Sequence, residues 1–347
     1  MKIAVAAIAL NEEQFVTRWA QSCVEADYRF ILDTGSTDGT TGLAHENGVH
    51  WVRKHFVPWR FDTARNAALA LLPEDIDYVI WLDMDEVLQP GWRQIMEALP
   101  DGVTRPRYRY VWSHNPDGSE GLVYAGDKIS TRQNYTWVHP CHEVLTPVGI
   151  AETHFFMEGF EIHHYPDHTK SRSQYFDLLK LAVEEKPTDP RNQYYLGREY
   201  FYHGEFGLAQ YHLSEFLKLS NWPPERASAR RMIAKMRPDH AEGLLYLAVA
   251  EDPTRRENWV ALAKWYYDRQ DWEGVRSACQ MAFRVQVKPL DYLCEPEAWG
   301  WLPHDLMAIA SFYLGDVATA RQHGQIAADL APDDQRLRDN LCWYEVG

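Results

Sequence analysis

The sequence predicts an α/β domain with a mostly parallel sheet, followed by an all-α domain of helical repeats. Two observations predict the first domain: strand and helix patterns alternate from residue 3 onwards, and the buried run 78–82 ends in a group of acids. A third predicts the second domain, because small residues recur at helical offsets beyond about residue 170. We therefore expect two domains, 1–170 and 171–347, which suits a chain of 347 residues.

The elements of the first half follow from hydrophobic periodicity. Apolar runs predict strands at 3–10, 29–32, 49–52 and 78–82. Helical spacing predicts helices at 12–24, from near 38, and at 62–72. Between 105 and 146, alternating residues and turns predict an antiparallel addition that closes one side of the sheet.

The second half resembles the tetratricopeptide repeat, whose period is ~34 residues. Three windows, 196–209, 259–282 and 307–332, align by the spacing of their small and aromatic residues. The windows are not evenly spaced, and the segment 227–251 fits only as a degenerate helix pair. A generic helical bundle is the alternative.

Composition excludes several classes of protein. A net charge of -15 disfavours broad binding to a phosphate backbone, so nucleic acid is not an expected partner. The five cysteines show neither CxxC nor zinc spacing, which favours a reducing compartment, and we expect a cytoplasmic protein. We interpret 3–10 as a first strand rather than a signal peptide, because the polar Asn11-Glu12-Glu13 follows at once.

The acidic group Asp83-Met84-Asp85-Glu86 carries the functional argument. It follows a buried strand, so its carboxylates are expected at the carboxyl edge of the sheet, where open α/β folds bind ligands. Oxygen ligands there suit Mn²⁺ or Mg²⁺ on a diphosphate. Asp-x-Asp also occurs in ordinary solvated loops, so the motif needs its upstream neighbours.

Those neighbours complete a family pattern, in order and in interval. The stretches are 9–13 (ALNEE), 32–40 (LDTGSTDGT), 61–68 (FDTARNAA) and 82–86 (LDMDE). Together they resemble the inverting glycosyltransferases of family 2, which have the GT-A fold, a Rossmann-like nucleotide-diphospho-sugar transferase fold, and the resemblance covers residues 1–170. It implies metal-dependent transfer from a nucleotide-diphosphate sugar, with a UDP-sugar favoured, to an acceptor hydroxyl.

The resemblance also assigns residues to the nucleotide sugar. Strand ends and turns would contact the base, ribose or diphosphate through Leu10, Asn11, Glu12, Asp33, Ser36, Asp38, Arg65, Asn66 and Asp83. A guanidinium offers forked donors to phosphate oxygens, which is the role expected for Arg65; its alternative is a surface ion pair with Asp62. Asn11 and Asp38 have a second interpretation as helix caps.

Metal and base roles follow in the same way. Asp85 would bind the ion directly, and Asp83 would contact the ribose or reach the ion through water. A later histidine completes the metal site in similar enzymes, and we favour His163 over His164 because it follows the strand-like run 160–162. Inverting transfer also needs a base, for which we favour Glu143, with Glu86 as the runner-up and Asp83 not excluded.

The acceptor stays open at this stage, because glycans, peptides, lipids and small molecules are all acceptors in family 2. Lys128 lies in an alternating strand from which it would reach the acceptor side. The helical half would bind an acceptor, a protein partner or a second copy. Two other functions compete: an interaction scaffold with an inactive first domain, and transfer to a modified nucleic-acid base.

Overall fold

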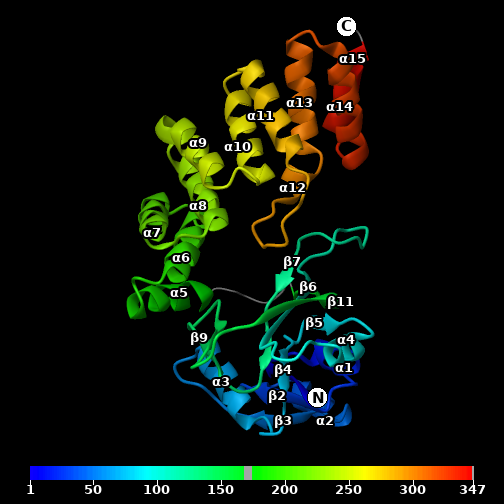
Figure 1. Cartoon of the computed structure of the whole chain (residues 1–347), viewed down its shortest axis with the longest axis vertical. Coiled ribbons are helices and arrows are strands. Elements are labelled where there is room, and N and C mark those ends of the chain that lie inside the picture. The colour runs from blue at the N-terminus through cyan, green and yellow to red at the C-terminus, as the bar shows by residue number, and fades with distance from the viewer. Residues whose placement is uncertain (168–173, 346–347) are drawn as a thin grey trace. The chain divides into compact units, whose positions relative to one another are not determined.

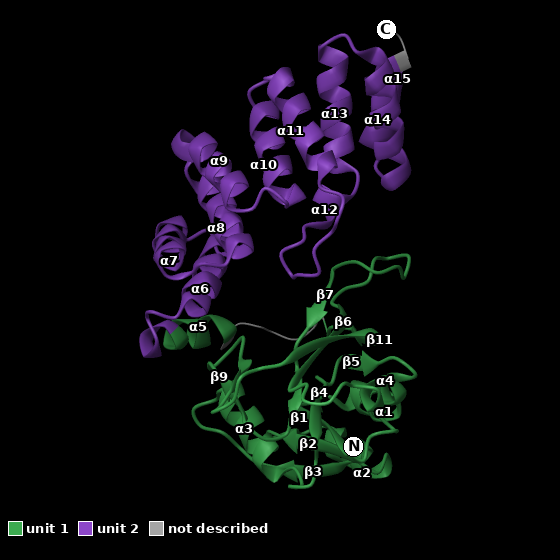
Figure 2. Cartoon of the chain, viewed as in Figure 1, with its two compact units in different colours: residues 1–182 green, residues 183–347 purple. Residues whose placement is uncertain are grey.

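The computed structural model describes residues 1–167 and 174–345 (Figure 1). The chain forms two compact units, residues 1–182 and 183–347 (Figure 2), and each is described here by itself. Our predicted boundary at residue 170 lies outside the described residues and stays a prediction.

A five-stranded sheet of order β3-β2-β1-β4-β8 forms the centre of the first unit. Its first four strands are parallel, as predicted, and β8 joins β4 antiparallel at one edge. These strands are β1 (Ile3–Ala9), β2 (Tyr28–Asp33), β3 (His50–Arg53), β4 (Tyr78–Trp81) and β8 (Ile129–Thr131). The accompanying helices are α1 (Glu13–Ser22), α2 (Thr40–Glu46), α3 (Phe61–Leu71) and α4 (Trp92–Glu97).

A four-stranded sheet of order β5-β11-β6-β7 and a two-stranded ribbon β9–β10 complete this unit. Their bounds are β5 (Glu86–Leu88), β6 (Arg105–Val111), β7 (Val123–Gly126), β9 (Tyr135–Val138), β10 (Val144–Pro147) and β11 (His154–His164). The expected antiparallel addition is present in β6–β7, β9–β10 and the edge strand β8. The long strand β11 differs, because it pairs parallel with β6 and antiparallel with β5.

Alternation along β1 explains why the central sheet is covered on both faces. Val5 points into the core that contains Trp19 of α1, whereas its neighbour Ala6 points into the core that contains Ala68 of α3. Because successive side chains of a strand point to opposite faces, a continuous apolar strand requires a layer on each side. This burial fixes the strands, and with them the position of the polar residues at their carboxyl ends.

The second unit consists of helices that pack as antiparallel pairs: α6 with α7, α8 with α9, α10 with α11, and α13 with α14. After α5 (Gln174–Glu185), which spans the unit boundary, the bounds are α6 (Pro190–Tyr202), α7 (Phe206–Leu219), α8 (Pro223–Met236), α9 (Ala241–Glu251), α10 (Arg256–Tyr267), α11 (Trp272–Arg284), α12 (Pro296–Trp299), α13 (Leu302–Tyr313), α14 (Val317–Leu330) and α15 (Gln335–Glu345), with one 3-10 turn at Pro238–His240. The unit is a tetratricopeptide-like helical region, and the degenerate segment 227–251 lies in the pair α8–α9.

Small residues let paired helices approach. A Cβ placed on Gly197 of α6 would lie 2.9 Å from the side chain of Leu213 in α7. Helix starts are capped: Asp271 accepts a hydrogen bond from the backbone of Gly274, and Asp316 accepts one from Thr319. The spacing that suggested repeats thus reflects helix contacts and caps.

No helix among the described residues is both long enough and apolar enough to cross a membrane.

Candidate active site

The candidate site lies where the parallel strands end. Because β1, β2 and β4 run in the same direction, their last residues, Ala9, Asp33 and Trp81, lie at one edge of the sheet. The acidic turn follows β4 directly, and β5 starts at Glu86. The structure therefore brings the strand-end motifs to one edge, the place where α/β sheets bind ligands.

Asp83 is held between two cations. Arg65 Nη2 donates to its Oδ1 at 2.8 Å, and Lys128 Nζ donates to its Oδ2 at 2.5 Å. Burial would raise the pKa of Asp83, but the charges of Arg65 and Lys128 outweigh burial and hold the pKa far below its usual range. Asp83 is therefore ionised, with both oxygens facing cations.

Arg65 also binds the predicted base. Its Nε donates to Glu143 Oε1 at 2.5 Å, and its guanidinium lies over the rings of Trp137 and Trp81 at 4.7 and 5.7 Å. Burial would lower the pKa of Arg65, but the charges of Asp83 and Glu143 raise it. One buried guanidinium, on a residue only 4% exposed, thus connects two predicted site carboxylates.

The alternative of a surface ion pair between Arg65 and Asp62 is wrong. Asp62 pairs with Arg60 at 2.8 Å, and Arg65 points to the sheet edge instead. Arg60 is the N-cap of α3 and Arg65 lies within the helix, so their side chains meet different partners.

Glu86 is a buried structural acid. It is 1% exposed, and it accepts hydrogen bonds from the Asp83 backbone at 2.8 Å, from the Tyr110 hydroxyl at 2.6 Å and from Lys128 at 3.0 Å. Burial raises the pKa of Glu86, and Lys128 opposes the rise. Glu86 closes the acidic turn, so as a base that must reach an acceptor it is a poor candidate beside Glu143.

His164, and not His163, is the histidine beside Asp85. His164 Nε2 lies 3.2 Å from Asp85 Oδ2, and its Nδ1 lies 2.9 Å from the carbonyl oxygen of Trp112. Burial would lower the pKa of His164, but the hydrogen bond with Asp85 and its charge raise it. The structure thus places His164, rather than the favoured His163, beside Asp85, because successive side chains of β11 point to opposite faces and the register pairs His164 with Glu86 of β5. Which histidine binds a metal stays a prediction.

His163 belongs to a separate group on the opposite face of β11. Its Nε2 lies 3.2 Å from Glu161, and its Nδ1 lies 3.2 Å from His114 Nε2. Ligand atoms of Glu120, Glu161 and His163 lie within 4.8 Å of one another, as in a metal cluster. Arg109, however, pairs with both glutamates, so one cation already lies between these two acids.

The loops after β1 and β2 are tied to each other by the residues predicted to bind nucleotide. Asn11, in the left-handed region with φ 56°, donates its backbone N–H to Ser36 Oγ at 2.8 Å and accepts from the Thr37 N–H at 2.8 Å. Asp38 accepts from the backbone of Glu13 at 3.1 Å, at the start of α1. Neither Asn11 nor Asp38 is the N-cap of the helix that follows it. Asp38 instead accepts a hydrogen bond from the first residue of α1, a helix that precedes it in the chain.

The remaining predicted nucleotide residues differ in accessibility. Leu10 is 49% exposed at the edge, and the Glu12 backbone donates to Thr40 Oγ1 at 2.7 Å. Asp33 is fully buried and accepts from the Ser36 backbone at 3.0 Å and from Arg53 Nε at 2.5 Å. Asp33 therefore orders the turn in this structure, and Arg53 covers it.

The side chain of Asn66 bonds to β9. Its amide donates to the Trp137 carbonyl at 2.8 Å and accepts from the Trp137 N–H at 2.8 Å, and Thr136 donates to the same oxygen. These bonds fix β9 against α3, so the side chain has a clear structural task.

The sequence did not predict that Lys128 and Tyr110 bond to the acids of this group. Lys128 directly precedes β8, and its place follows from the antiparallel pairing of Ile129 with Ile80. The alternating pattern of the strand suggested that Lys128 faces the site, but not that its partners are Asp83 and Glu86.

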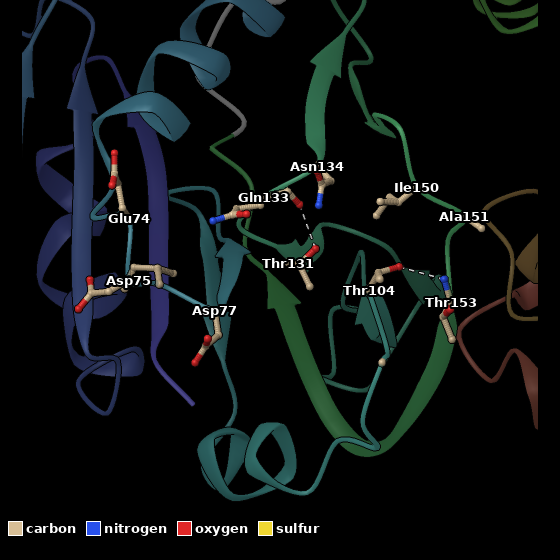
Figure 3. A pocket seen from close by; sticks show the side chains of 12 residues that line it. Glu74, Asp75, Asp77, Thr104, Thr131, Gln133, Asn134, Ile150, Ala151 and Thr153 are labelled. Atoms are coloured by element: carbon tan, nitrogen blue, oxygen red, sulfur yellow. Dashed lines mark hydrogen bonds between the residues drawn. The ribbon is translucent and has the colours of Figure 1, made fainter.

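A pocket of about 550 Å³ lies at the other end of β4 (Figure 3). It is lined by residues that precede the strand, including Asp75 and Asp77, and by Thr104, Thr131 and Thr153. Thr104 and Thr153 bond to each other there, and the acids and cations of the carboxyl edge are not among its lining. The pocket is therefore separate from the candidate site.

Residues 4–126 match the model of "Glycosyl transferase family 2". A search of curated protein sequences gives no match to this chain.

Similar solved structures include tetratricopeptide proteins and a transferase. A thermophilic tetratricopeptide protein of Thermus thermophilus is 15% identical over 50% of this chain and 91% of its own, with a TM-score of 0.35, and PilF of Pseudomonas aeruginosa is 12% identical over 47% and 70%, with 0.39. Glucosyl-3-phosphoglycerate synthase of Mycobacterium tuberculosis is 25% identical over 31% and 43%, with 0.28. At these TM-scores the likenesses carry no argument about ligands.

The first unit thus carries a glycosyltransferase domain of family 2, over residues 4–126, within its mixed α/β fold. A tetratricopeptide-like helical region follows it.

Proposed function

We propose that this protein is a divalent-metal-dependent, inverting glycosyltransferase that uses a nucleotide-diphosphate sugar, with UDP as the favoured nucleotide. The observation that supports this most is Arg65, which holds the donor-side Asp83 and the predicted base Glu143 on one buried guanidinium. In this proposal, donor and acceptor chemistry lie next to each other at the carboxyl edge, in a domain of family 2.

The residues at this edge fit a divalent cation. Asp85 offers carboxylate oxygens and His164 an imidazole nitrogen beside it, a donor set that suits Mn²⁺ and, through the oxygens, Mg²⁺. Among the described residues, the bonded group at this edge also has two more carboxylates than permanent cations, which equals the charge of one such ion. These groups are Asp83, Asp85, Glu86 and Glu143, against Arg65 and Lys128.

In this proposal Asp85 and His164 would hold the ion directly. Asp83, whose oxygens bond to Arg65 and Lys128, would reach the ion through water. Bound there, a divalent cation would neutralise charge on the departing nucleoside diphosphate. Lys128 and Arg65 keep Asp83 ionised and in one orientation, so that the site needs little reorganisation during the reaction.

Glu143 takes the proton of the acceptor hydroxyl. Arg65 occupies Oε1 of Glu143, which leaves Oε2 as the atom that accepts this proton. The side chain is 11% exposed, enough to meet a substrate, whereas Glu86 is closed off. Attack of the deprotonated oxygen on the anomeric carbon, opposite the leaving diphosphate, inverts the configuration.

The nucleotide lies in this proposal over the tied loops after β1 and β2. Leu10, Asn11 and Glu12 form one side, and Ser36 and Asp38 form the other. Asp33 contributes by ordering its turn. Asn66 does not contact the nucleotide in this proposal. It holds β9 against α3 through its hydrogen bonds with Trp137.

Calorimetry with a panel of UDP-, GDP- and dTDP-sugars tests the proposal, in Mn²⁺ and in chelator. We expect binding of one donor in Mn²⁺, loss of binding in chelator, and loss in Asp85→Asn. Asp117→Asn is the control, because Asp117 is exposed in the hairpin turn and bonds with Ser119. If wild type binds no donor in either condition, the transferase proposal fails and a scaffold function takes its place.

A further inference from the structure

One exposed indole lies directly beside the candidate site. Trp112, directly after β6, is 36% exposed, and its ring stacks on His164 with centroids 4.5 Å apart and planes inclined by 23°. His164 in turn reaches Asp85 at 3.2 Å. The imidazole of His164 thus lies between the Trp112 ring and Asp85, a carboxylate that we assign to the donor side.

The position of Trp112 is fixed in several ways. The backbone N–H of Trp112 donates to the Leu122 carbonyl at 2.9 Å, and His164 Nδ1 bonds with the carbonyl oxygen of Trp112 at 2.9 Å. Tyr124 of β7 and Tyr110 of β6 continue the same sheet face, with ring centroids 6.4 and 6.2 Å from the indole. A large apolar ring that is both exposed and rigidly held costs little entropy when a ligand packs on it.

We propose that Trp112 is the platform for the acceptor, and that the acceptor is a neutral saccharide whose ring stacks on the indole. The inference rests on the proposed function and names its second substrate. A pyranose presents a face of C–H groups, which packs on the electron-rich face of an aromatic ring. Its hydroxyls need acceptors and donors, which carboxylates and an ammonium at this edge supply.

Charge selects against an anionic acceptor. The acids of the bonded group at this edge exceed its permanent cations by two, and a divalent ion would only balance them. A bound nucleoside diphosphate then adds negative charge, so a phosphorylated acceptor would enter against repulsion. A neutral sugar carries no such penalty.

Saturation-transfer NMR tests the platform with cellobiose, maltose, lactose and N,N′-diacetylchitobiose as neutral probes, and with glucose 6-phosphate as the anionic one. Each is added to the complex with Mn²⁺ and UDP, and the affinity for Mn²⁺–UDP is measured separately. The variants are Trp112→Ala, Trp112→Phe and, as a matched control, Trp51→Ala, since Trp51 on β3 is 38% exposed.

We expect at least one neutral probe to bind wild type, to bind Trp112→Ala about tenfold more weakly, and to regain affinity in Trp112→Phe, a difference of about 1.4 kcal/mol. Trp51→Ala and the affinity for Mn²⁺–UDP should not change. The inference is overturned if Trp112→Ala binds the probes like wild type, if no neutral probe binds, or if glucose 6-phosphate binds best. Normal Mn²⁺–UDP binding in those cases leaves the proposed function standing, whereas a wild-type protein that binds no nucleotide-sugar donor of the calorimetry panel contradicts that function itself.

Discussion

Asp83 and Glu143 are bound by one guanidinium: Arg65 Nη2 donates to Asp83 at 2.8 Å, and Arg65 Nε donates to Glu143 at 2.5 Å. Asp83 follows β4, whereas Glu143 precedes β10, so the arginine connects two distant parts of the fold. A buried ion that pairs with two carboxylates orients both, and its removal leaves charges without partners.

Arg65→Lys tests this connection. An ammonium cannot donate in a fork to two carboxylates, so Asp83 and Glu143 should lose their fixed geometry. We expect sugar transfer to fall by about 100-fold, the cost of a small misplacement of reacting groups. Turnover of the donor found by calorimetry measures it. Arg60→Lys is the control, since Arg60 pairs locally with Asp62; equal losses in the two variants would contradict a specific role for Arg65.

Glu143→Gln separates chemistry from donor binding. The amide keeps the size of the side chain but cannot take a proton, so the rate constant for transfer should fall by about 10²–10⁴-fold. The affinity for Mn²⁺–UDP should stay close to wild type. Single-turnover rates and calorimetry measure the two quantities. Glu158→Gln, on an exposed position of β11, should change neither, and wild-type rates in Glu143→Gln would remove this residue as the base.

Gly197 tests the repeat packing. A Cβ at this position would lie 2.9 Å from Leu213 Cγ and 3.0 Å from its backbone nitrogen, so Gly197→Ala should lower the free energy of unfolding by about 1–3 kcal/mol. Gly207, in the partner helix α7, has no atom of the described residues within 4 Å of its Cβ position. There Gly→Ala should raise stability by about 0.4–1 kcal/mol. Urea unfolding followed by circular dichroism compares them; the same sign in both would contradict the close approach of α6 and α7.

Glu251 predicts an acid-dependent loss of stability. Hydrogen bonds from Arg226 and Arg230, at 2.7 and 2.8 Å, together with their charges, lower the pKa of Glu251 from 4.5 to about 2. Because the pKa is lower in the folded state, the stabilisation is present above pH 4.5 and is lost as the pH falls towards 2. The difference in the free energy of unfolding between wild type and Glu251→Gln should be constant near neutral pH and shrink below pH 4.5. The exposed Glu242→Gln is the control, and a difference that does not depend on pH would refute the ion pair.

Much of the fold followed from local pattern. The parallel strands, the helices between them and the helix pair in 227–251 are where hydrophobic periodicity predicted them, with ends shifted by a few residues. The acids after β4 lie at the carboxyl edge, because a buried strand determines where its last residue lies. The assignments of nucleotide, metal and base stay predictions, now with named partners.

The histidine next to Asp85 shows where pattern fails. His163 and His164 both follow an apolar run, and a shift of one residue in register exchanges their faces. The pairing of β11 with β5 decides between them, and that pairing joins segments far apart in the chain. The burial of Glu86 could not be predicted for a related reason, since it depends on Tyr110 and Lys128 from other parts of the sheets.

The sequence by itself determined the two-part architecture, the strand that ends in Asp83-x-Asp85 and the helical repeat, because periodicity and turn chemistry act over a few neighbouring residues. Only the tertiary structure decided which cation faces which acid: Arg65 between Asp83 and Glu143, Lys128 between Asp83 and Glu86, and His164 beside Asp85. Such pairs depend on strand register and helix orientation across long sequence distances. Packing of the whole core determines that register and orientation, so no single segment of the sequence predicts them.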